Sequence, residues 1–398
     1  MSVIALVLSF NCWAMTLADI ERLAINRSSS LSAQEMESHA LKSEANAQGK
    51  WQNPQFMSQI GTLKSGTMQG STVEVSITQP VPVTNKYSLR KELADIATVN
   101  HKLDSEFTKN WISHQAVLAA WRVSITSELL KHGVERTKRL GLVEKYLKTR
   151  SKVTIKQRVE LSIISSTLVQ LEKMQDEKKH ESLVAKSDLE FWIGKFNEDQ
   201  LNLKIPEHYQ FLEKKKIDTS KDLELAKAQN ALKLSSLDRE LASKERWPDV
   251  FLGGGYRIEN VAPKNHFSYA ILGLTIPLWD SGSNRVEAAR VRERRDEKNL
   301  EEVTKRLFLK HQNQLELINF SKEQLKRFPK SFVRINESAI HEAETGFKQG
   351  LLDVNTFLLA ETQTHEVIDQ VFLSWMNYLE NLSALQLMKG EKLNWGIN

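Results

Sequence analysis

The chain has 398 residues, with 55 Lys or Arg and 50 Asp or Glu, and its formal net charge is +5. Charges of both signs are interspersed without a basic block, which favours solvated helix faces, so we expect no nucleic-acid partner. There are only 16 Gly and 8 Pro, and no Pro lies between Pro82 and Pro206. This composition predicts helices much longer than those of an ordinary globular domain.

Residues 1–14 are predicted to be a cleaved export signal. An apolar run at residues 3–10 is followed by Asn11-Cys12-Trp13-Ala14, which resembles a signal-peptide cleavage region, although no Lys or Arg precedes the run. A plain apolar N-terminus is the alternative. Cys12 is the only cysteine and no lipid-attachment box surrounds it, so we expect neither a lipid anchor nor thiol chemistry in the mature chain.

Sequence landmarks occur twice, at an offset of about 195 residues, which predicts a tandem repeat. Trp51-Gln52-Asn53-Pro54 precedes one predicted strand pair and Trp247-Pro248 precedes the other, while Pro80 and Pro277 close them. Each unit is expected to contain a helix, two strands and a long helical hairpin. The first repeat is predicted at residues 15–196, an equatorial connector at 197–217 and the second repeat at 218–398.

Four strands are predicted, at about residues 54–64, 71–83, 248–260 and 266–280. In the fourth, Ala270, Leu272 and Leu274 lie on one face and polar or small residues on the other. The second and third strands alternate similarly, and the first alternates poorly. Each is about 10 residues long, the length of a tilted membrane β-strand, but an ordinary half-buried sheet alternates in the same way.

Two long helices are predicted at residues 86–148 and 284–345, each about 90 Å long at 1.5 Å per residue. With their returning helices they form hairpins at residues 86–194 and 284–390, with tips at 149–156 and 346–354. Apolar residues in the first helix recur every three or four positions, as in a coiled-coil seam. Asn100 and His114 fall on this seam as packed polar residues, and Pro329 is expected to kink the second helix.

No motif predicts catalysis, a cofactor or a metal site. Gly253-Gly254-Gly255 lacks the spacing of a phosphate-binding loop and is expected to mark a bend or bulge in its strand. His101, His114, His132 and His341 lack the spacing of a tetrahedral ligand set. Because no nucleophile, base and orienting group occur together, we expect the chain not to be an enzyme.

Several segments resemble the TolC family of outer-membrane efflux ducts. They are Trp51-Gln52-Asn53-Pro54, residues 76–82 (SITQPVP), residues 274–280 (LTIPLWD) followed by Asn284-Arg285, residues 346–354 (GFKQGLLDV) and residues 377–390 (NYLENLSALQLMKG). Their order, spacing and duplication carry the resemblance, which covers the whole mature chain.

The resemblance implies a mainly α protomer with a small β part, built from two long coiled-coil hairpins and four membrane strands. Three such chains would close a 12-stranded β-barrel in the outer membrane of a Gram-negative bacterium, above an α-helical barrel that crosses the periplasm. The family's members are passive exit paths that work with a periplasmic adaptor and an energised inner-membrane pump. The pump selects the substrate.

The resemblance also assigns residues to the hairpin tips. Asp353 matches an acidic position that narrows the periplasmic aperture in the family, and Thr356 stands where the family can carry another acidic residue. For Asp353, a plain helix N-cap is the alternative. The tip residues expected to contact the adaptor are Arg150, Ser151, Lys152, Val153, Gly346, Lys348, Gly350, Leu351 and Leu352.

Within the family, the compact length, the missing lipid box and the short loops most resemble the CzcC-type branch, which serves RND-type pumps for heavy-metal cations. A drug-efflux duct and a type I protein-secretion duct are alternatives within the family. A soluble periplasmic coiled-coil scaffold and a periplasmic adaptor are alternatives outside it, although an adaptor would show one hairpin rather than two.

Overall fold

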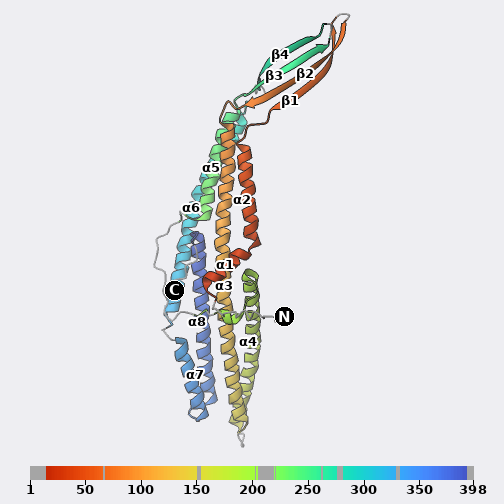
Figure 1. Cartoon of the computed structure of the whole chain (residues 1–398). Helices are drawn as coiled ribbons and strands as arrows, with labels where there is room; N and C mark the ends of the chain where they lie inside the picture. Colours follow the sequence, from red (N-terminus) through yellow and green to blue (C-terminus); the bar gives the residue numbers. More distant parts are fainter. Residues whose placement is uncertain are drawn as a thin grey trace, which may run out of the picture. The chain divides into compact units, whose positions relative to one another are not determined.

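A computed structural model describes residues 15–65, 68–149, 154–201, 203–204, 219, 221–260, 263–275, 281–328 and 332–391. In this part of the chain, long helices accompany one four-stranded sheet (Figure 1). The predicted signal at 1–14, residues 150–153 of the first tip and most of the predicted connector lie outside the described residues.

The chain divides into two compact units, which interleave along the sequence. Unit 1 takes residues 1–31, 106–221 and 308–398, and unit 2 takes residues 32–105 and 222–307. The helices are α1 (Leu17–Arg27), α2 (Ser29–Gln48), α3 (Lys86–Lys148), α4 (Ile155–Ile193), a short 3-10 turn η1 (Glu198–Gln200), α5 (Leu223–Glu245), α6 (Ser283–Lys326), α7 (Phe332–Lys348) and α8 (Val354–Met388). The strands, all in unit 2, are β1 (Gln55–Ser65), β2 (Met68–Val81), β3 (Asp249–Asn260) and β4 (Asn265–Thr275).

The four predicted strands form one antiparallel sheet in the order β1-β2-β3-β4, so β1 and β4 are its edges. Their bounds lie within a few residues of the predicted ones, and residues 276–280 of the predicted fourth strand lie outside the described range. None of the helices in the described part of the chain has a stretch long and apolar enough to cross a membrane.

Of the bend or bulge expected at residues 253–255, the bulge is wrong, because the pairing of β3 with both neighbours is uninterrupted. Thr78, Ile77 and Ser76 on β2 lie opposite Gly253, Gly254 and Gly255, one residue to one residue. The glycines instead make room for close neighbours. A Cβ on Gly255 would lie 2.8 Å from Cε2 of Tyr269, which is closer than Cβ contacts normally come.

Helix α3 has the predicted bounds, and its seam packs as predicted within each unit. In unit 2, Leu89 and Ile96 of α3 form a buried cluster with Leu237 of α5. Asn100 accepts a hydrogen bond of 2.6 Å from the side-chain amide of Asn230. In unit 1, His114 is buried and its Nδ1 lies 2.9 Å from the hydroxyl of Ser383 on α8.

The single kinked helix predicted at 284–345 is instead two helices, α6 and α7. Helix α6 ends at Lys326, where Arg327 and Phe328 make tight bonds to the carbonyls three residues back, at 3.2 and 3.1 Å. Proline removes a backbone donor and disfavours helical geometry in the residue before it, which explains an end just before Pro329. Pro329 itself lies outside the described residues.

The core of unit 1 is a helical bundle with aromatic side chains at its centre. Trp121 of α3 meets Trp375 of α8 edge-on, with ring centroids 5.7 Å apart. Ile20 of α1 and Leu189 of α4 complete the same buried cluster. Burial of such side chains is worth about 1.5–3 kcal/mol each, so this cluster stabilises the unit strongly.

Candidate functional site

The turn between α7 and α8 in unit 1 carries most of the predicted tip residues. Gly350 has φ +76°, a left-handed conformation that favours glycine. The amide of Leu351 donates to the carbonyl of Gly346 at 2.8 Å, and the amide of Gly350 donates to that of Phe347 at 3.0 Å. These two bonds form a Schellman motif, so Gly350 sets the direction of the chain as α7 ends.

The other predicted contact residues of this turn differ in exposure. Leu352 packs over Gly346, where an added Cβ would lie 3.3 Å from Leu352 Cδ1. Leu351 is 75% exposed, and Lys348 is exposed and pairs with Glu344 at 2.6 Å. Leu351 and Lys348 are therefore the accessible members of the set, whereas Gly346 and Leu352 shape the turn.

Asp353 is the N-cap of α8. Its side chain accepts a hydrogen bond of 2.7 Å from the amide of Thr356, and both residues are exposed. Hydrogen bonds from the Thr356 backbone, then from the Thr356 side chain, lower the pKa of Asp353, and the nearby charge of Lys156 lowers it further. The N-cap role is thus present, and it fixes a charged carboxylate at the exposed end of α8.

A buried cluster beneath the turn joins it to the α3–α4 hairpin. Phe347 stacks on Phe357 of α8 with centroids 5.4 Å apart, and meets Tyr146 of α3 edge-on at 6.1 Å. The Tyr146 hydroxyl donates to the carbonyl of Lys348 at 3.5 Å. The ends of α3, α4, α7 and α8 are therefore packed as one layer. Arg150, Ser151, Lys152 and Val153 lie outside the described residues.

A buried charged cluster in unit 1 was not predicted from the sequence. Glu361 of α8 has no exposed surface and accepts a hydrogen bond of 2.9 Å from Nε of Arg136 on α3. Nε2 of His365 lies 3.2 Å from the other carboxylate oxygen. One turn further along α8, burial raises the pKa of Asp369. The available signal was a Glu and a His four residues apart on the apolar face of a helix.

One face of the sheet is apolar across all four strands. The pairing puts Phe56, Ile77, Gly254 and Ala270 in one row across the sheet. Its exposed large apolar side chains are Phe56, Ile60, Val75, Ile77, Leu252, Tyr256, Leu272 and Leu274. The poorly alternating first strand contributes Phe56 and Ile60 to this face, at 70% and 77% exposure. A continuous exposed surface of this kind marks contact with lipid or another protein.

The opposite face of the sheet is mostly polar. It carries Glu74 on β2, Arg257 and Glu259 on β3, and Tyr269 on β4. Arg257 pairs with Glu259 at 3.0 Å, and the Tyr269 hydroxyl donates to Glu74. The sheet therefore has two exposed faces of different chemistry.

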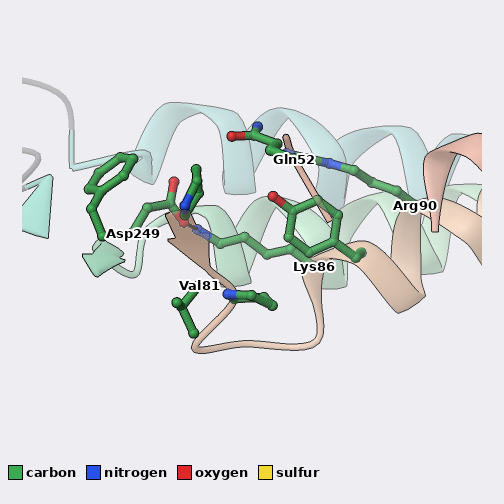
Figure 2. A pocket seen from close by; sticks show the side chains of 9 residues that line it. Gln52, Val81, Lys86, Arg90 and Asp249 are labelled. Atoms are coloured by element: carbon green, nitrogen blue, oxygen red, sulfur yellow. Dashed lines mark hydrogen bonds and ion pairs between the residues drawn. The ribbon is translucent and has the colours of Figure 1, made fainter. Parts of the chain in front are cut away.

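A small cavity of about 60 Å³ lies where the sheet meets α3 (Figure 2). The ammonium group of Lys86 is buried there, donating to Asp249 at 2.9 Å and to the carbonyl of Trp247 at 3.0 Å. Arg90 pairs with Glu245 at 3.0 Å beside it. The cavity has room for water molecules rather than an organic ligand. The ion pair between Lys86 and Asp249 links the start of α3 to the start of β3. Among the described residues, no group of three or more His, Cys, Asp or Glu could hold a metal ion.

Comparisons with known proteins rest on structure alone, because no family model and no curated protein matches the chain. The open state of the MtrE outer membrane channel of Neisseria gonorrhoeae is similar, with a TM-score of 0.76 and 14% identity over 95% of this chain and 90% of that one. The CmeC outer membrane channel of Campylobacter jejuni gives 0.72 and 12%, over 96% of this chain and 87% of that one.

The outer membrane protein VceC of Vibrio cholerae is also similar, with a TM-score of 0.72 and 12% identity over 95% of this chain and 97% of that one. These matches span nearly the full length of both chains in each comparison. The sheet and both helical hairpins are thus part of the shared architecture. The chain has the fold of outer-membrane channels of the TolC type, as the sequence resemblance led us to expect.

Proposed function

We propose that three copies of the chain form an exit duct through the outer membrane of a Gram-negative bacterium. The observation that carries this proposal is the apolar face that crosses all four strands of a chain with an outer-membrane channel fold. A four-stranded sheet has two unpaired edges, and open edges are not tolerated in lipid. Pairing β4 of one copy with β1 of the next would close 12 strands into a barrel without edges.

In this arrangement the apolar face meets lipid and the face with Glu74 and Arg257 lines an aqueous lumen. The long helices continue the duct into the periplasm as a second, helical barrel. No chemical step is required of the protein, because the duct is a passive path and its energy source is the pump in the inner membrane.

The hairpin ends form the aperture in this proposal. Asp353 supplies a ring of three carboxylates, one from each copy, and Thr356 lies one helical turn behind it. The periplasmic adaptor contacts the accessible side chains Lys348 and Leu351 on a turn shaped by Gly346, Gly350 and Leu352, together with residues 150–153 of the first tip. Because α3, α4, α7 and α8 pack as one layer there, adaptor binding shifts a closed–open equilibrium of the whole layer.

The proposed cargo is heavy-metal cations delivered by an RND-type pump. Resemblance to the CzcC-type branch supports this choice, and the carboxylate at Asp353 is compatible with passage of cations. Drug efflux and type I protein secretion use the same architecture. Expression in a host that lacks its own ducts, together with the neighbouring pump and adaptor genes, distinguishes the cargoes: restored resistance to metal salts, to drugs, or restored secretion.

Substitution on the two faces of the sheet tests the duct directly. Leu272→Arg puts a charge on the exposed apolar face, which costs about 2–4 kcal/mol at the bilayer midplane. Gln59→Arg puts the same charge on the polar face and is the matched control. We expect purified wild-type and Gln59→Arg proteins to give conductance steps in planar bilayers, and Leu272→Arg to give few or none. Equal insertion of both variants, or no conductance from the wild type, would contradict the proposal.

A further inference from the structure

We propose that Glu74 is a charge-selectivity determinant in the lumen of the duct, held in position by Tyr269. This inference rests on the proposed function, since it requires the polar face of the sheet to line an aqueous passage. It concerns the strand end of the duct and is independent of Asp353 at the hairpin end.

Three adjacent strands build this position. Glu74 on β2 lies opposite Arg257 on β3, and Gly255 on β3 lies opposite Tyr269 on β4. The Tyr269 side chain crosses β3 above Gly255, and its hydroxyl donates a hydrogen bond to the Glu74 carboxylate two strands away. A side chain at position 255 would block this crossing, because even its Cβ would overlap the tyrosine ring.

The bond to Tyr269 is informative because Arg257, the cation directly opposite Glu74, is engaged elsewhere. The Arg257 guanidinium pairs with Glu259 on its own strand at 3.0 Å. The other acidic side chain on this face in the described strands, Asp249, pairs with Lys86 at the junction with α3. Glu74 is thus held by a neutral hydroxyl, which orients the carboxylate without cancelling its charge.

The charged side chains around Glu74 leave this part of the polar face with a net negative charge. Glu74 and Glu259 contribute two negative charges and Arg257 one positive charge, which leaves one net negative charge for each copy. Repeated around a closed duct, the three Glu74 carboxylates form a ring beside uncharged side chains, which include the polar Gln59 and the apolar Met57 and Phe267. A fixed ring of one sign raises the local concentration of ions of opposite sign and favours their passage.

The test is the ratio of potassium to chloride permeability, measured from reversal potentials of the purified full chain in planar bilayers under a potassium chloride gradient. Glu74→Gln removes the carboxylate, and we expect the ratio to fall by at least about twofold. Arg257→Gln removes the neighbouring cation and should raise the ratio. Tyr269→Phe keeps every charge but releases the carboxylate, so we expect a smaller fall at unchanged conductance.

Opposite shifts in Glu74→Gln and Arg257→Gln support the inference, because a merely structural role of either residue would not give shifts of opposite sign. Conducting channels whose ratio is the same in all variants would overturn it and leave the duct standing. An absence of channels in the wild type would overturn the duct as well. If Glu74→Gln does not insert, Arg257→Gln decides: a ratio that is unchanged or lowered there would overturn the inference.

Discussion

His114 shows how a single buried residue makes stability depend on pH. Burial between α3 and α8 lowers the pKa of His114 from 6.5 to about 4. As the pH falls, the His114 side chain is protonated in the unfolded chain before it is protonated in the folded chain. The contribution of neutral His114 to stability is therefore fully present above pH 6.5 and is lost as the pH falls toward 4. The expected loss is on the order of 3 kcal/mol. Thermal unfolding at pH 7 and pH 4.5 measures it, and His114→Gln should show a clearly smaller change than the wild type.

The buried ion pair of Arg136 and Glu361 can be compared with an exposed ion pair on the same two helices, so the effect of burial on its contribution to stability can be tested. The side chains of Arg136 and Glu361 are 11% and 0% exposed, whereas those of Arg122 and Glu380 are 44% and 40% exposed. Arg136→Met strands a buried carboxylate and should cost about 3–5 kcal/mol. Arg122→Met should cost under about 1 kcal/mol. Urea unfolding compares them, and equal losses would show that the first pair is accessible to water.

At the scale of elements, replacing a glycine by alanine should change the stability of the fold in opposite directions at two positions, one on each hairpin. Gly350 has φ +76°, so Gly350→Ala strains the turn that ends α7 and should destabilise by about 1 kcal/mol. Gly133 lies inside α3 with nothing within 4 Å of an added Cβ, so Gly133→Ala should stabilise by a similar amount. Chemical denaturation of the two variants measures both changes in stability. An unchanged stability of Gly350→Ala would show that the turn does not require glycine at this position.

Elements with a regular apolar period could be predicted from the sequence, and elements without one could be predicted only in part. The bounds of α3 followed from an uninterrupted apolar period, and three strands followed from alternation. The first strand alternates poorly because Met57 is apolar on the polar face, at 62% exposure, so only the pairing with β2 reveals its role. Pro329 was recognised as a disruption, but a sequence does not say whether a helix bends or ends there.

The candidate site could be predicted only in part, because many of its contacts join residues that lie far apart in the sequence. Periodicity showed that α8 buries one face, but not that Glu361 would meet Arg136 or that His365 would join them. The N-cap at Asp353 was predictable because the spacing to its donor is local. The crossing of Tyr269 over Gly255 required the register of three strands, which composition and alternation leave open.

At the scale of the whole molecule, the proposed duct requires several chains to assemble. A single copy has two unpaired strand edges, an apolar sheet face and large apolar side chains exposed along its helices, among them Ile155, Val159 and Phe191 on α4. Each of these features is costly in an isolated chain in water. In the proposed duct the strand edges would pair between copies, the apolar sheet face would meet lipid, and the helix side chains would pack between copies. These features support the proposed closed trimer in the outer membrane.

The most direct measurement is the mass of the protein extracted by mild detergent from purified outer membranes of cells expressing the full chain. We expect the protein in that fraction, as a species of three chains that collapses to one on boiling. A protein recovered as a single chain from the soluble periplasmic fraction would contradict the duct and favour a coiled-coil scaffold.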